Sequence, residues 1–251
     1  MTGVLIKVGQ FPVYTMSFFI VVAFLWFGFV VYKKGLEYHY KEETLFDLTI
    51  SAGVLGWIMA RVGYVLLNLD IFSQNFLRTI LLSEYPGYNF IGLLVGILLA
   101  NWLISKQGEI KKYDGLDLIG LGLMAASAIQ QIGVVMAGGG QQFGWKSVQI
   151  PKELVGALFF LLSFVWLWRL EREYRTFTWY RYRRTQARSG FIYGAYHFLF
   201  GCVVIGLSLV PKLDLVNLLT GVGLTLIGVF FIYWRSGRTI THDVKSLIRK
   251  S

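Results

Sequence analysis

Seven long apolar runs follow one another along the chain, separated by short polar segments. A helix that crosses about 30 Å of hydrocarbon needs about 20 predominantly apolar residues, which is close to the length of these runs. Because the apolar residues are continuous rather than alternating with polar ones, the runs predict helices and not strands. The predicted spans are residues 13–32, 48–69, 85–104, 116–136, 153–168, 190–210 and 215–234.

The amino-acid composition agrees with a membrane protein. Of the 251 residues, 55% are hydrophobic and only 15% are charged, whereas a soluble domain carries about 25% charged residues. A soluble core of this size would therefore lack the charged surface that it needs. The predicted fold class is an all-α integral membrane protein, a seven-transmembrane-helix bundle that forms a single membrane domain over residues 1–251.

The distribution of basic residues predicts the orientation of the chain. Eighteen of the 24 Lys and Arg residues fall in the first, third and fifth loops and the C-terminal tail, five fall in the alternate segments, and Arg61 lies inside a span. Cytoplasmic segments carry the excess of Lys and Arg. The N-terminus is therefore predicted outside and the C-terminus in the cytoplasm. The first run is expected to remain as a span rather than to be cleaved as a signal peptide.

Two features argue against other classes of function. The fifth loop, Arg169–Arg188, is strongly basic and rich in aromatic residues. Topology alone accounts for such a loop, and contact with anionic headgroups fits it better than binding of nucleic acid. The single cysteine, Cys202, and three widely separated histidines provide no disulfide and no metal-ligand spacing. No metal, other cofactor or nucleic-acid partner is expected.

Arg61 is a charged residue within an apolar run, 13 residues after the start of the second predicted span. A charge near the centre of the bilayer costs about 2.5–3.5 kcal/mol on insertion scales, and such residues usually face a cavity or a partner. Helical spacing places Trp57, Tyr64 and Asn68 on the same face as Arg61. Guanidinium binds phosphate in bidentate fashion. This face therefore predicts a site for an anionic lipid phosphate.

A structural role for Arg61 is the alternative. Its guanidinium would then hold the bundle together, through a salt bridge to Asp117 or Glu153 or through a clamp of backbone carbonyls. A neighbouring stripe of small residues predicts the close approach of another helix. The stripe consists of Gly53, Gly56, Ala60 and Gly63.

Polar residues in the later spans also have two interpretations. Gln130 and Gln131 in the fourth span either contact a ligand or make interhelical hydrogen bonds. The run Gly138–Gly140 is expected to end that helix. His197 in the sixth span is either a packing residue or a general base, since its ordinary pKa of about 6.5 suits proton transfer.

Six segments, taken in order, carry a resemblance to a known family. They are residues 11–14, 53–68, 87–96, 117–144, 151–154 and 193–198, and the most specific part is the Arg-x-Gly-Tyr motif at Arg61–Tyr64. These segments resemble the prolipoprotein diacylglyceryl transferase family of the bacterial cytoplasmic (inner) membrane. The resemblance covers most of the chain, from about Phe11 to Arg235.

The resemblance implies seven spans, an outside N-terminus and a specific reaction. Diacylglyceryl would move from phosphatidylglycerol to a cysteine thiol of a lipoprotein precursor, and glycerol phosphate would leave. Such a reaction needs a base for the thiol and cations for the departing phosphate. On this basis His197 is the candidate catalytic residue. The candidate lipid-binding residues are Tyr14, Arg61, Tyr64, Asn68, Asn89, Gln130 and Gln131.

The sequence departs from the family pattern at the reactive positions. A histidine of the family falls at Ile91, and a signature arginine and asparagine fall at Gln131 and Val134. A later acidic residue falls at Gly139, and the arginine and glutamate of the sixth span fall at His197 and Gly201. Glutamine cannot replace the charge of arginine, and isoleucine cannot accept a proton.

Two functional hypotheses follow from these observations. In the first, the protein is a divergent transferase whose reaction centre is rebuilt around Arg61, His197 and the two glutamines. In the second, it is a non-catalytic relative that binds an anionic phospholipid or a lipoprotein segment, as a subunit of a membrane complex. Family membership favours the first hypothesis and the replaced residues favour the second, so enzymatic activity stays open at this point.

Overall fold

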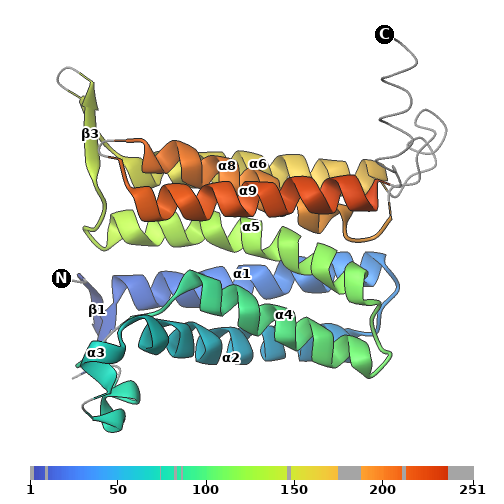
Figure 1. The fold of residues 1–251 in the computed structure, drawn as a ribbon, viewed down its shortest axis with the longest axis horizontal. Helices are drawn as coiled ribbons and strands as arrows, with labels where there is room; N and C mark the ends of the chain where they lie inside the picture. The colour runs from blue at the N-terminus through green and yellow to red at the C-terminus, as the bar shows by residue number, and fades with distance from the viewer. Residues whose placement is uncertain are drawn as a thin grey trace. The chain divides into compact units, whose positions relative to one another are not determined.

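Seven helices of 17 residues or more dominate the computed structural model, which describes residues 3–8, 11–73, 75–81, 84–85, 87–145, 148–174, 188–210 and 213–236 (Figure 1). These helices are α1 (Thr15–Glu37), α2 (Glu42–Leu67), α4 (Phe90–Lys106), α5 (Lys112–Met136), α6 (Lys152–Tyr174), α8 (Phe191–Ser208) and α9 (Leu215–Arg235). Two short helices, α3 (Leu69–Phe72) and the 3₁₀ helix η1 (Phe76–Thr79), lie between α2 and α4.

The outward faces of the helices carry large apolar side chains, as in membrane proteins. Six of the described helices are long and apolar enough to cross a bilayer, and α4 is a shorter apolar helix. Large apolar side chains such as Leu25, Leu162 and Phe230 are more than half exposed. Apolar exposure along many helices is incompatible with water as the only solvent. The chain is therefore a helical, multi-pass integral membrane protein.

Several helix boundaries differ from the predicted spans. The third span was predicted to start at Tyr85, but α4 starts only at Phe90. Its start is fixed by Asn89, whose side-chain Oδ1 accepts a hydrogen bond from the Gly92 N–H at 2.9 Å. The fifth span was predicted to end at Trp168, whereas α6 continues to Tyr174. Charged residues after Trp168 end the apolar run, but they do not interrupt a helix.

Two β-hairpins accompany the helices, one before α1 and one between α5 and α6, and the apolar pattern did not predict them. Strand β1 (Val4–Val8) pairs antiparallel with β2 (Phe11–Tyr14), directly before α1. Strand β3 (Gln142–Trp145) pairs antiparallel with β4 (Val148–Pro151), between α5 and α6. The glycine run before β3 ends α5 as expected, because Gly138 adopts a left-handed φ of 73° and the Gly139 N–H donates to the Val134 carbonyl.

The chain forms two compact units, one of residues 32–116 and the other of residues 1–31 and 117–251. Helices α1 and α5 are continuous across the boundary, and the single membrane domain stays a prediction. In the first unit α2 and α4 lie side by side (Figure 1). Their contact confirms the small-residue stripe at Gly56 and Gly63, because Gly56 packs against Leu93 and Gly63 packs against Gly92.

The second unit holds the hairpins, α6, α8 and α9, and most of α1 and α5. Helices α8 and α9 pack closely through glycines on both helices, namely Gly194, Gly201, Gly221 and Gly228. The Asp117 carboxylate on α5 is fully buried and accepts hydrogen bonds from the backbone N–H groups of Gly190 and Tyr193, both at 2.8 Å. These N–H groups lie at the start of α8, so Asp117 fixes the start of that helix against α5.

The tight α2–α4 contact makes Gly96 sensitive to substitution. A Cβ atom at Gly96 would collide with the backbone carbonyl of Leu55, which cannot rotate away. We expect Gly96→Val to cost about 1–3 kcal/mol of stability, the typical cost of overpacking. The measurement is thermal unfolding in detergent. Gly223→Val on α9 is the matched control, because nothing lies within 4 Å of its added Cβ. Equal effects of the two substitutions would contradict the close approach of α2 and α4.

Candidate functional site

The Arg61 guanidinium is held by backbone carbonyls of the segment that follows α2. Its Nε donates to the Thr79 carbonyl at 3.0 Å, and one terminal nitrogen donates to the carbonyls of Tyr85 at 2.8 Å and Gly87 at 3.1 Å. The other terminal nitrogen donates to the Arg78 carbonyl at 3.2 Å. These four bonds use four of the five N–H donors of the guanidinium. The arrangement is a carbonyl clamp, one of the structural alternatives for Arg61.

Aromatic rings and burial complete the environment of Arg61. The guanidinium carbon lies 5.7 Å from the ring centre of Tyr64 and 5.2 Å from that of Phe72, within the range of cation–π attraction. The side chain is only 7% exposed. Arg61 is six residues from the last residue of α2, or about 9 Å along the helix axis. It therefore lies closer to one end of the helix than the predicted span indicated.

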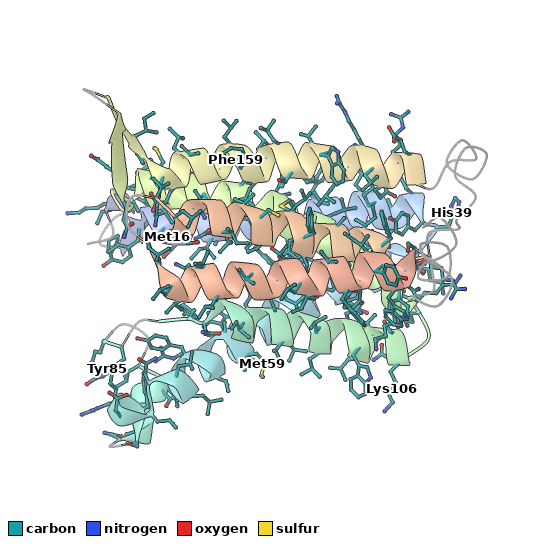
Figure 2. All side chains as sticks on the ribbon, turned by 45° about the horizontal axis from the view of Figure 1, so that its top comes forward. Met16, His39, Met59, Tyr85, Lys106 and Phe159 are labelled. Carbon is teal, nitrogen blue, oxygen red and sulfur yellow. The ribbon has the colours of Figure 1, made fainter. Side chains whose placement is uncertain are left out.

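The other predicted residues of this unit contribute to the same structure. The Tyr64 ring lies against Gly87, where an added Cβ would collide with it. The Asn68 Nδ2 donates to the Tyr64 carbonyl at 2.8 Å. Asn89 caps α4, and its backbone N–H donates to the Ala60 carbonyl at 2.9 Å. We call Arg61, Tyr64, Asn68 and Asn89 the α2 clamp, because they hold the connection between α2 and α4. Figure 2 shows Tyr85 in this connection and Lys106 at the opposite end of α4.

Tyr14, Gln130 and Gln131 belong to the second unit. Tyr14 ends β2, where it pairs with Val4, and its side chain is exposed. Gln130 and Gln131 lie on α5 and are half-buried. The Gln131 amide lies near Gly156 of α6, with 3.8 Å between its Cδ and the position of an added Cβ. It therefore contacts the start of α6 as a neutral group.

His197 packs among aromatic side chains of α8 in this structure. Its imidazole is 4% exposed and lies edge-on between Tyr193 and Tyr196, with ring centres 4.3 Å and 4.9 Å apart. The Nδ1 atom lies 3.0 Å from the Tyr193 carbonyl oxygen. This contact suits an Nδ1–H tautomer, which leaves Nε2 as the acceptor. His197 lies six residues after the start of α8, about 9 Å along the axis.

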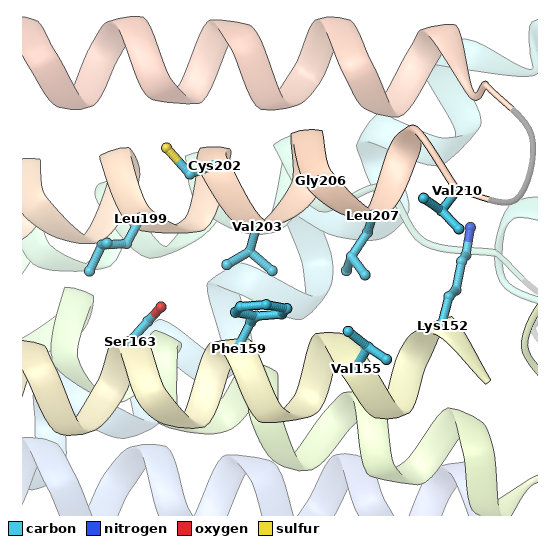
Figure 3. A pocket seen from close by; sticks show the side chains of 10 residues that line it. All are labelled: Lys152, Val155, Phe159, Ser163, Leu199, Cys202, Val203, Gly206, Leu207 and Val210. Carbon is cyan, nitrogen blue, oxygen red and sulfur yellow. The ribbon is translucent and has the colours of Figure 1, made fainter. Parts of the chain in front are cut away.

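A groove between α6 and α8 is the feature that sequence reasoning missed. It has a volume of about 420 Å³, and nearly all of its lining is apolar (Figure 3). Its polar lining side chains are Lys152 and Ser163 on α6 and Cys202 on α8. The groove depends on which faces of α6 and α8 meet, and the hydrophobic pattern of either helix alone gives no signal for it.

These features define a helical membrane protein with a buried arginine clamp and an apolar groove. The chain matches the family model "Prolipoprotein diacylglyceryl transferase" over residues 3–234. The chain therefore belongs to the prolipoprotein diacylglyceryl transferase family, as the resemblance predicted.

Three curated relatives show how distant the individual similarities are. The phosphatidylglycerol–prolipoprotein diacylglyceryl transferase of Clostridioides difficile is 29% identical over 104 residues, which cover 41% of this chain and 42% of the relative. The Bacillus mycoides protein of that name is 24% identical over 131 residues, covering 52% and 48%. A Clostridium perfringens protein named transferase 2 is 23% identical over 136 residues, covering 54% and 52%. The chain spans about half the length of the curated relatives it matches.

The hydrogen bonds of Arg61 predict the effect of its replacement on stability. In Arg61→Ala the four carbonyls lose their donor, and we expect a loss of about 2–4 kcal/mol of stability. Arg61→Lys is expected to recover only part of this, because an ammonium has three donors and lacks the planar fork. We also expect faster hydrogen exchange in peptides that cover η1 and Asn89, measured by mass spectrometry. Lys106→Ala, at the far end of α4, is the control.

The same experiment separates the two roles of Arg61. Unchanged exchange in Arg61→Ala, combined with weaker binding of phosphatidylglycerol, would contradict the clamp and support direct contact with a lipid phosphate.

Proposed function

We propose that this protein binds phosphatidylglycerol in the bacterial inner membrane as a family member that does not transfer the diacylglyceryl group. One observation carries the proposal: Arg61, Asp117 and His197, three of the ionisable residues that the sequence singled out in the spans, each engage backbone groups. These three residues therefore stabilise helix ends and helix contacts of the fold.

The chemistry of diacylglyceryl transfer explains why ionisable residues that engage backbone groups favour binding without transfer. A thiol must lose its proton, and negative charge on the departing phosphate must be stabilised. At the position of a family arginine stands Gln131, whose neutral amide lies near Gly156 of α6. At the position of a family histidine stands Ile91, which is exposed on α4. Neither side chain supplies a charge or a proton acceptor.

Transfer from phosphatidylglycerol to a lipoprotein precursor is the second candidate function. The family match over residues 3–234 and the names of the relatives favour it. In this case His197 acts as the base through Nε2, and the candidate lipid-binding residues are Tyr14, Gln130, Gln131 and the α2 clamp. A lipoprotein segment is a ligand compatible with both candidates, since a relative that has lost transfer can retain the binding surface for the precursor.

The proposal includes seven spans with the N-terminus outside. Helix α4 has 17 residues, at the short end of the range of about 17–25 residues for a transmembrane helix. If α4 spans, the ends of the chain lie on opposite sides, as the distribution of Lys and Arg predicts. The clamped end of α2 then faces outward, and the end of α8 near His197 faces the cytoplasm. The basic loop Arg169–Arg188, which lies mostly outside the described residues, is cytoplasmic in this topology.

The two candidate functions differ in one assay. Purified wild-type protein is expected to retain phosphatidylglycerol through gel filtration but to transfer no labelled diacylglyceryl to a lipobox peptide. The Clostridioides difficile relative serves as the positive control for transfer. Transfer by the wild type above the protein-free rate would reject our proposal in favour of the second candidate, and loss of that transfer in His197→Ala would identify the base.

The topology is tested with reporters on the two ends of the full chain. Green fluorescent protein at the C-terminus is expected to fluoresce, because it folds in the cytoplasm. Alkaline phosphatase at the N-terminus is expected to be active, because it requires an oxidising compartment. Both ends on the same side of the membrane would contradict the seven-span topology.

A further inference from the structure

We infer that the groove between α6 and α8 holds one acyl chain of an anionic phospholipid, with the lipid phosphate at Lys152. The inference rests on the proposed function for the identity of the lipid, and it adds the location and chemistry of the site. It involves only helices of one compact unit.

The shape and lining of the groove suit a hydrocarbon chain. Its volume of about 420 Å³ lies within the range of about 300–1,000 Å³ for small-molecule sites. Valine, leucine and phenylalanine side chains from both helices point into it, including Val155, Phe159 and Val203 (Figure 3). An added Cβ at Gly206 would meet nothing within 4 Å, so the groove is widened by a missing side chain.

The depth of the groove matches one leaflet of the bilayer. Lys152 is the first residue of α6, and Ser163 lines the groove 11 residues further along the helix. This separation corresponds to about 16 Å along the axis, or roughly half of the 30 Å hydrocarbon core. A transmembrane helix of a partner would need a contact face across the whole bilayer. An acyl chain of a lipid needs only the half that the groove provides.

The charge at the groove entrance selects an anionic headgroup. The Lys152 side chain extends toward Val210 at one end of the groove (Figure 3). Its Nζ donates to the side-chain Oε1 of Gln141 at 3.0 Å, which leaves two of its three N–H donors for a phosphate. The start of α6 adds the positive end of a helix dipole. Glu153, the next residue, does not line the groove, and its Oε1 accepts a bond from the Gln141 N–H at 3.2 Å.

Two matched pairs of variants test the site. Gly206→Leu fills the groove, while Gly223→Leu adds the same side chain at another open position on α9. Lys152→Gln removes the charge at the entrance, while Lys111→Gln removes a charge before α5. Full-length protein is purified in micelles containing equal amounts of phosphatidylglycerol and phosphatidylcholine, and the retained lipids are quantified by mass spectrometry.

The expected results separate the acyl chain from the headgroup. Gly206→Leu should reduce retention of both lipids, and Lys152→Gln should reduce the preference for phosphatidylglycerol about fivefold, which corresponds to about 1 kcal/mol of binding free energy. Lys152→Arg should keep the preference, and both controls should behave as wild type. Retention unchanged by Gly206→Leu and Lys152→Gln would overturn the groove site while leaving the proposed function standing. Failure of the wild type to retain phosphatidylglycerol would reject both.

Cys202 provides an independent readout on the wild-type chain. It is the only cysteine and it lines the groove. A bound acyl chain should therefore slow its modification by N-ethylmaleimide. We expect protection to increase with added phosphatidylglycerol and to be weaker with phosphatidylcholine. Labelling rates that do not depend on either lipid would contradict the inference, even if Gly206→Leu fails to fold.

Discussion

The hydrocarbon core provides no hydrogen-bond partners, so each polar group within a span must find one in the protein. This constraint decides the environment of Arg61. A guanidinium has five donors, and four of them meet the carbonyls of Arg78, Thr79, Tyr85 and Gly87. Those carbonyls belong to the connection between α2 and α4, two of them at the end of η1 and two after it, where backbone carbonyls need donors from outside a helix. The Arg61 side chain thus supplies hydrogen-bond donors to four carbonyls of the connection, and these carbonyls supply acceptors for four of its N–H groups.

In the other unit, a negatively charged side chain pairs with backbone groups in the same way. The first N–H groups of a helix have no partners within the helix. Asp117 of α5 accepts two of them at the start of α8, and the first turn of α8 lies close to α5 as a result. His197, two turns into α8, then packs between two tyrosines. Residues that look like candidates for chemistry in an apolar sequence therefore support helix ends and helix contacts.

The sequence predicted those parts of the fold that depend on local pattern. The long helices follow from apolar runs, and the stripe that includes Gly56 and Gly63 indicated a helix contact. Its counterpart on α4, Gly92 and Gly96, became evident only from the packing. The bonds of Asp117 join residues more than 70 positions apart, and no local pattern encodes such a distance. The candidate lipid-binding residues are polar residues in or beside the spans, and polarity in a sequence cannot distinguish a group that holds backbone from one that faces a ligand.

Polar residues at the ends of spans and grooves between spans therefore indicate lipid binding better than the buried charged residues do. A buried cation that is already bonded to four carbonyls would have to lose bonds before it could hold a phosphate. A lysine at the first residue of a span keeps donors available at the depth of the headgroups. An apolar groove beside it can be occupied without breaking any hydrogen bond in the protein. The energetic cost of binding a phospholipid is thus lower at α6 and α8 than at the α2 clamp.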